Sequence, residues 1–294
     1  MPNPKVTLVA TGDRKFFPTV LDRWTMNENT NEIWQVQGTN LRRHIIGEYF
    51  GNSVENAVKN QKFGGLQTFD VQAIIDYKAS KVFTKDFLGK KIYSTNLNGE
   101  NQKLIFTTPN SSQIICMDVD NTKGIIYYAD AGTNSIKSVK TDGTNPKEII
   151  KNAGINNTQI GYVAQDIHVD GSKGKIYWIK DNKAAKRLAI MKANTDGTGV
   201  TTLWDATYSG LNGSGFNLHF VIDEQSQQIF FVRTLLETNK LDTDNFHKLY
   251  RDHLIKMDTS GKNLKALFSA EYKPVAWGQS ELFQLTISKQ EPLN

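Results

Sequence analysis

The stretch that decides the fold is IICMDVDNTKGIIYYAD, residues 114–130, together with its close copy DIHVDGSKGKIYWIK, residues 166–180. Each copy has a short run of alternating polar and apolar residues that ends in aspartate, a turn that ends in glycine, and a second run rich in aromatic residues. Alternation over so few residues is typical of a half-buried β-strand, and the glycine-containing break favours a turn. Each copy therefore predicts two antiparallel strands joined by a turn.

The same plan recurs along the whole chain of 294 residues. The aliphatic residue that opens the second strand recurs about every 50 residues, at Ile33, Val82, Ile126, Ile176, Ile229 and Leu282. Four units also carry a small polar turn before a last strand, at Asn98-Gly99, Asp142-Gly143, Asp196-Gly197 and Ser260-Gly261. Asn-Gly and Asp-Gly suit tight hairpin turns whose central residues need positive φ. Each unit therefore predicts four strands.

A four-stranded unit repeated six times is the signature of a β-propeller, because one blade cannot bury both faces of its sheet alone. We predict an all-β, six-bladed propeller of four-stranded antiparallel blades that fills the chain as one domain. The units lie at roughly 17–50, 66–109, 113–154, 163–208, 216–272 and 274–294. The last unit is short of strands, so we expect residues 5–11 to complete it and close the ring by strand pairing. The alternative is an unrelated β-sandwich with accidental spacing.

The second strands of two units, IYYAD at 126–130 and IYWIK at 176–180, follow an Asp-x3-Gly turn and precede an Asp-Gly-Thr turn. In this arrangement they resemble the class B (YWTD) repeats of low-density lipoprotein receptors. The resemblance is clear over residues 113–200 and weaker over 66–110 and 216–268. It implies a six-bladed propeller that binds partner proteins on one face.

The chain departs from this motif at its last position. The motif's aspartate is present at Asp130 and, in VFTKD, at Asp86. Lys180 replaces it in the fourth unit and Arg233 in the fifth. The resemblance identifies no ligand, because partner-contacting residues lie outside the motif.

Composition excludes several classes of protein. A single cysteine, Cys116, rules out an intramolecular disulfide framework and a multi-cysteine zinc site, and we expect it to be a small buried apolar residue. The net charge of +5 is spread along the chain, whereas nucleic-acid binders concentrate it on one face. We expect a protein or glycan partner, no nucleic acid, no membrane insertion and a monomeric chain. The first residues lack the apolar run of a secretory signal, so we expect an intracellular protein or the mature form of a secreted one.

The first strand of each unit carries the candidate chemistry, because we expect it to line the propeller axis. Alternate residues on a strand share a face. One face is apolar and is expected to pack between blades, with Met117, Val119, Ile167, Val169, Phe220 and Ile222 among its members. The other is mostly polar, and its candidate ligand-binding residues are Arg23, Gln72, Asp118, Asp166, His168 and His219.

Histidines and carboxylates that converge on one axis can hold a divalent metal or supply a general base. They can equally form a water-filled channel whose polar walls hydrogen-bond one another. No cofactor is predicted, and a divalent metal at the channel stays open. The aspartates at the first turns, Asp76, Asp120, Asp170 and Asp223, recur in successive units, so we expect them to cap their own turns and not to bind calcium.

Irregular segments are where function is most often added to a repeat scaffold. The longest insertion runs from residue 233 to 253 in the fifth unit, and residues 47–65 are expected to hold a short helix between the first two blades. The aromatic candidates for partner contact on loops are Trp204, Tyr208, Phe246 and Tyr250. Such residues anchor a partner, stack on a sugar or cover the core.

These features favour a non-enzymatic module that recognises a protein through the loop face of the propeller. A carbohydrate-binding, lectin-like propeller is the first alternative; repeated equivalent loop aromatics would favour it, but Trp204 has no counterparts. A metal-dependent hydrolase or lyase at the axial mouth is the second, by analogy of fold alone.

Overall fold

The computed structural model describes residues 24–27, 32–45, 61–76, 78–86, 88–97, 100–155, 166–182, 184–207, 218–236 and 250–272. Within these ranges every regular element is a β-strand, which confirms the all-β prediction. None of the residues described forms a helix long and apolar enough to cross a membrane.

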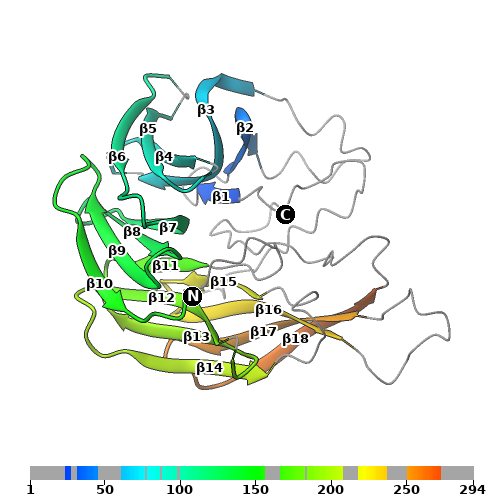
Figure 1. Ribbon diagram of the computed structural model, residues 1–294. Helices are drawn as coiled ribbons and strands as arrows, with labels where there is room; N and C mark the ends of the chain where they lie inside the picture. The colour runs from blue at the N-terminus through cyan, green and yellow to red at the C-terminus, as the bar shows by residue number, and fades with distance from the viewer. Residues whose placement is uncertain are drawn as a thin grey trace, which may run out of the picture.

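Three four-stranded antiparallel sheets follow one another along the chain. The first contains β7 (Ile114–Asp120), β8 (Ile125–Asp130), β9 (Ser135–Lys140) and β10 (Lys147–Lys151). The next contains β11 (Ile167–Asp170), β12 (Lys175–Asn182), β13 (Arg187–Asn194) and β14 (Thr201–Thr207). The third contains β15 (Leu218–Asp223), β16 (Gln228–Leu236), β17 (Tyr250–Asp258) and β18 (Lys265–Tyr272). We call these sheets B, C and D; their first strands lie toward a common centre and their fourth strands outside (Figure 1).

Sheet A precedes them and has six strands. They are β1 (Trp24–Asn27), β2 (Glu32–Ile45), β3 (Gln61–Asp76), β4 (Lys81–Asp86), β5 (Lys91–Asn96) and β6 (Lys103–Thr107). Strands β3 to β6 form a four-stranded unit like those of sheets B to D, and β3 lies beside β7.

The junction of the first two units differs from our prediction of separate blades. Strand β2 pairs with β3 from Gly38↔Asp70 to Arg43↔Gln61. Both strands run past the length of a blade, and their extended ends satisfy each other's backbone groups. Residues 61–65 are strand, while residues 46–60, around which the short helix was expected, lie outside the described residues, so the helix stays a prediction. The closing strand at 5–11 and the last unit also lie outside them, so the number of blades stays a prediction.

The residue that opens each second strand lies at the centre of the core. Val82, Ile126, Ile176 and Ile229 are all 0% exposed. Each pairs with an apolar residue of the first strand, in the pairs Ile75↔Val82, Val119↔Ile126, Val169↔Ile176 and Ile222↔Ile229. The spacing read from the sequence therefore marks one buried layer that is repeated in every sheet.

Three apolar clusters lie between successive sheets, so each inner sheet buries both of its faces. Met117 and Val119 belong to the cluster between sheets A and B, Ile167 and Val169 to the one between B and C. Phe220 and Ile222 belong to the cluster between sheets C and D. This confirms that the apolar face of the first strands packs between blades.

The turn aspartates cap their own turns, as predicted. The Oδ1 atom of Asp120 accepts hydrogen bonds from the N–H groups of Thr122 and Lys123, at 2.9 and 3.1 Å. Equivalent bonds reach Asp76 from Ala79, Asp170 from Lys173 and Asp223 from Gln225. All four aspartates are at most 2% exposed, and a carboxylate buried at this level needs such donors.

The turn between the third and fourth strands contacts the preceding sheet through a glycine. Gly143 has φ of +86°, and a Cβ on it would lie 1.8 Å from the carbonyl oxygen of Ile105 in β6. Gly197, with φ of +89°, makes the equivalent contact with Ile149 in β10 at 2.2 Å. These positions therefore need glycine for two reasons, the backbone conformation and the contact.

We predict that Gly143→Ala destabilises the fold more than Gly174→Ala. Gly174 has φ of +63°, but its Cβ would meet only the Thr195 hydroxyl at 3.7 Å, so alanine there costs about 1–2 kcal/mol of backbone strain. At Gly143 the clash with Ile105 adds about 1–3 kcal/mol. Chemical denaturation of the two variants measures the difference. Equal loss of unfolding free energy would show that the contact between sheets contributes nothing.

Candidate functional site

Two first strands and one turn bring three ionisable side chains together across three sheets. Asp118 in β7 and His168 in β11 occupy the same position, two residues before the turn aspartate. The Nδ1 atom of His168 lies 3.4 Å from Oδ2 of Asp118, and its Nε2 lies 3.3 Å from Oε1 of Glu224, in the turn after β15. The Asp118 and His168 side chains are 22% and 29% exposed. Both are therefore within reach of water.

Asp118 is also bound to backbone groups. Its Oδ2 accepts a hydrogen bond from the N–H of Val169 on sheet C, and its Oδ1 from the N–H of Val119, both at 2.8 Å. Burial raises the pKa of Asp118 above its ordinary value, and His168 and the two N–H groups oppose that rise only in part. The carboxylate therefore links sheets B and C at some electrostatic cost.

Gln72 lies on β3 and joins sheet A to sheet B. Its Nε2 donates to the carbonyl of Met117 at 3.0 Å, and its Oε1 accepts from the N–H of the same residue at 3.1 Å. The side-chain amide, 7% exposed, thus pairs with the backbone of the next first strand as a neighbouring strand would. The polar face of the first strands therefore reaches the next sheet, and does not simply line an open channel.

The remaining axial candidates are less informative. Asp166 lies just before β11, where its carbonyl accepts the N–H of Ile179 at 3.1 Å. His219 lies in β15, where its backbone pairs with Val232 of β16, but its side chain is not among those described. Arg23 lies outside the described residues. Among the described side chains no group of three or more His, Cys, Asp or Glu is placed to hold a metal ion. The possible divalent-metal site at the channel also involves His219, so it stays a prediction.

Cys116 is 0% exposed within the cluster between sheets B and C. It is a free thiol, and its burial among apolar residues confirms the prediction that Cys116 is a small buried apolar residue.

The two aromatic candidates among the described residues, Trp204 and Tyr250, lie on strands. Trp204, expected on a link, lies within β14; its ring centroid is 4.8 Å from that of Phe231, and the guanidinium carbon of Arg233 is 5.6 Å from its centre. It therefore covers the core between sheets C and D. Tyr250 opens β17 and pairs with Leu236, so the insertion is confined to residues 237–249; Tyr208 and Phe246 lie outside the described residues.

The ends of the strands define two faces of the molecule. The face that carries the first-to-second and third-to-fourth turns is called the turn face. The opposite one, which carries the second-to-third connections and the links between sheets, is called the loop face.

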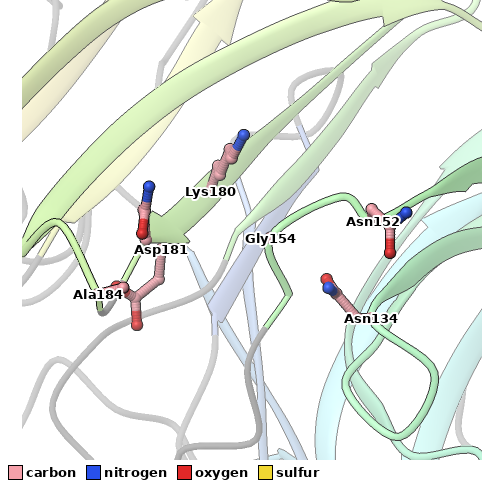
Figure 2. Close-up of a pocket in the computed structure, with 7 residues that line it drawn as sticks. Asn134, Asn152, Gly154, Lys180, Asp181 and Ala184 are labelled. Carbon is pink, nitrogen blue, oxygen red and sulfur yellow. The ribbon is translucent and has the colours of Figure 1, made fainter.

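On the loop face, between sheets B and C, lies a hollow of about 320 Å³. It is lined by Asn134, Asn152, Gly154, Lys180, Asp181, Asn182 and Ala184. In Figure 2, Asn134 and Asn152 lie on one side of the hollow and Lys180 and Asp181 on the other.

Sequence analysis missed this hollow, although one signal was present. In sheet B the motif aspartate Asp130 accepts hydrogen bonds from the N–H groups of Gln113 and Gly132, at 2.7 and 3.0 Å, and from Lys137 Nζ at 2.7 Å. Burial raises the pKa of Asp130, but Lys137 and the other donors outweigh it and lower the pKa overall. In sheet C the same position is Lys180, which lines the hollow.

Comparison with known proteins supports this architecture. No protein-family model matches the chain. Low-density lipoprotein receptor-related protein 1 of Pyricularia oryzae is 30% identical over 128 residues, which cover 38% of this chain and 39% of that protein. A chain of a nidogen/laminin complex has a TM-score of 0.52 at 17% identity, covering 87% of this chain and 98% of its own. The chain is a β-propeller that resembles the class B repeats of low-density lipoprotein receptors.

A second solved structure supports the propeller fold. A TolB protein of Agrobacterium tumefaciens has a TM-score of 0.56 at 17% identity, covering 88% of this chain and 83% of its own. At this identity the two structures bear on the fold alone. The chain spans about two fifths of the length of the relative from Pyricularia oryzae.

We predict that His168→Gln raises the pKa of Asp118 further, because His168 is the strongest of the influences that lower it. The folded-state pKa already lies above the ordinary value of 3.8, so Asp118 stabilises the fold below pH 3.8, and this contribution is lost as pH rises through the folded-state pKa. Carbon-detected NMR of the carboxyl group measures the pKa. Asp142, a fully exposed carboxyl whose pKa is lowered by Thr144, is the internal control. An unchanged or lower pKa of Asp118 would refute the proposed coupling.

Proposed function

We propose that the chain is a non-enzymatic binding module that recognises a protein partner through its loop face. The observation that carries the proposal is the contrast between the two faces. Turn-face aspartates are bound within their own turns in each sheet described, whereas on the loop face the capping aspartate of sheet B, Asp130, is replaced in sheet C by Lys180, which lines a hollow. The similar propeller chain from a nidogen/laminin complex supports the proposal, because it comes from a complex of two proteins.

The turn face repeats the same internal bonds from sheet to sheet. Asp142 accepts the N–H of Thr144 at 2.8 Å, and Asp196 accepts that of Thr198 at 2.9 Å. Hydrogen bonds from the Ser260 hydroxyl and from the N–H of Lys262 lower the pKa of Asp258 to about 2. These carboxylates, like the buried ones of the first turns, are already bound to donors of their own turns. The turn face is therefore suited to a structural role, which is to fix the turns that join adjacent strands.

The loop face is irregular and differs from sheet to sheet. Leu88, in the connection between β4 and β5, is 63% exposed. The hollow at Lys180 opens between sheets B and C on the same face. An exposed leucine and a polar hollow together resemble the mixture of apolar anchor and polar groups found in protein interfaces.

We expect a photoreactive residue at Leu88 or Asn152, both exposed on the loop face, to crosslink the same protein partner. A photoreactive residue placed at Lys123 or Asp142, both exposed on the turn face, should not crosslink this partner. Mass spectrometry of the crosslinked species identifies the partner. Equal crosslinking from both faces would contradict the proposal, and a glycan captured in place of a protein would favour the lectin-like alternative.

The purified partner then allows a quantitative comparison. Leu88→Arg should weaken binding by about tenfold or more, the effect of losing an interface anchor of about 1.4 kcal/mol or more. Leu104→Arg is the matched control, since Leu104 is also exposed, at 44%, but lies on outer strand β6. Calorimetry measures both affinities. Equal weakening by the two variants would remove Leu88 from the interface.

A further inference from the structure

The hollow on the loop face lies where sheet C departs from its neighbour. In sheet B the aspartate at the end of the motif ties down the preceding link, through Gln113, and its own loop, through Gly132. In sheet C a lysine stands at that position and donates where the aspartate accepts. A position at which the repeat varies is a place where a specific site can be built, because the scaffold does not require one particular residue there.

The backbone holds Lys180 in place. The N–H of Asp181 donates to the carbonyl of Gly154 at 3.0 Å, which joins β12 to the link between sheets B and C. Gly154 has φ of +76°, and a Cβ on it would lie 2.3 Å from Cγ of Lys180. The stem of the lysine therefore crosses Gly154 in close contact, which restricts its rotamers, and the residue lines the hollow.

The asparagines of the hollow are oriented by their oxygens. Oδ1 of Asn134 accepts the N–H of Ile155 at 2.8 Å, and Oδ1 of Asn182 accepts the N–H of Ala185 at 3.1 Å. With one lone pair of each oxygen engaged by backbone, the NH₂ end of each amide is its main remaining group for a ligand. Asn152 is exposed and adds a further amide. The polar groups that solvent reaches in the hollow are thus mainly hydrogen-bond donors.

We propose that this hollow binds a carboxylate, the side chain of an acidic residue on the protein partner. This inference rests on the proposed function. A carboxylate has only acceptors when ionised, so it matches two oriented NH₂ groups and an ammonium, and charge-assisted hydrogen bonds are the stronger kind. A neutral sugar needs acceptors as well as donors for its hydroxyl groups. Asp181, the one acidic residue of the lining, is 3% exposed and so offers little surface to a ligand.

The test titrates the full chain, labelled with ¹⁵N, with glutamate blocked at both its amino and α-carboxyl ends. The side-chain NH₂ signals of Asn134, Asn152 and Asn182 report on the hollow directly. We expect these signals to move with blocked glutamate and not with blocked glutamine, its neutral counterpart. Added salt should weaken the effect. No movement, or equal movement with both compounds, would overturn the inference.

Lys180→Met tests the role of the charge, since methionine keeps most of the apolar stem over Gly154. Its affinity for blocked glutamate should fall about tenfold. Lys173→Met is the matched control, because Lys173 is exposed on the turn face, and its affinity should not change. Thermal unfolding of both variants checks that each is folded. Equal affinities of the Lys180→Met variant and the unaltered chain would contradict the assignment.

A parallel titration with glucuronic acid separates a peptide from an acidic sugar. Binding of glucuronic acid more tightly than blocked glutamate would overturn the assignment to a protein side chain. Failure of all titrations with crosslinking from Leu88 intact would remove this inference and leave the proposed function standing. Loss of loop-face crosslinking with glutamate binding intact would remove the proposed function, and with it the assignment of the carboxylate to a protein partner.

Discussion

The close approach of one sheet to the next is the constraint on which the whole structure depends. Each inner sheet has two apolar faces, and its own strands can cover neither. Burial of a Val, Ile or Phe side chain contributes about 1.5–3 kcal/mol, and this gain is obtained only when a neighbouring sheet packs on both sides. The residues that open the second strands lie in these packed layers at 0% exposure. At the outer edge, Gly143 and Gly197 allow the third-to-fourth turn of one sheet to contact the backbone of the outer strand of the preceding sheet.

This constraint separates the roles of the two faces. The turns must repeat with the same geometry in each sheet, so their aspartates are bound within the turn, and a change there disturbs the packing. The loop face joins sheets by connections whose length and composition can vary. One such variation is Lys180 in sheet C, which replaces the aspartate found at Asp130 in sheet B and lines a hollow. Recognition on the loop face and support on the turn face follow from the same repeat.

The sequence predicted the parts of the fold that are local or periodic. The strand pairs, the buried layer at Val82, Ile126, Ile176 and Ile229, and the capped turns follow from spacing and turn chemistry. Periodicity does not show which distant backbone a side chain meets. The amide of Gln72 binds a residue 45 positions further along the chain, so it was assigned to a channel and in fact joins two sheets. The hollow was missed because its lining comes from two sheets and an ordinary lysine.

Hydrogen–deuterium exchange on the free chain and on its complex with the crosslinked partner tests the central claim most directly, because it covers both faces in one measurement. Our account predicts that the partner slows exchange in loop-face segments 88–90, 131–134, 152–154 and 184–186. Exchange in the exposed turn-face segments 141–146, 195–200 and 259–264 should stay unchanged. New protection in the turn-face segments, with none on the loop face, would contradict the assignment of recognition to the loop face.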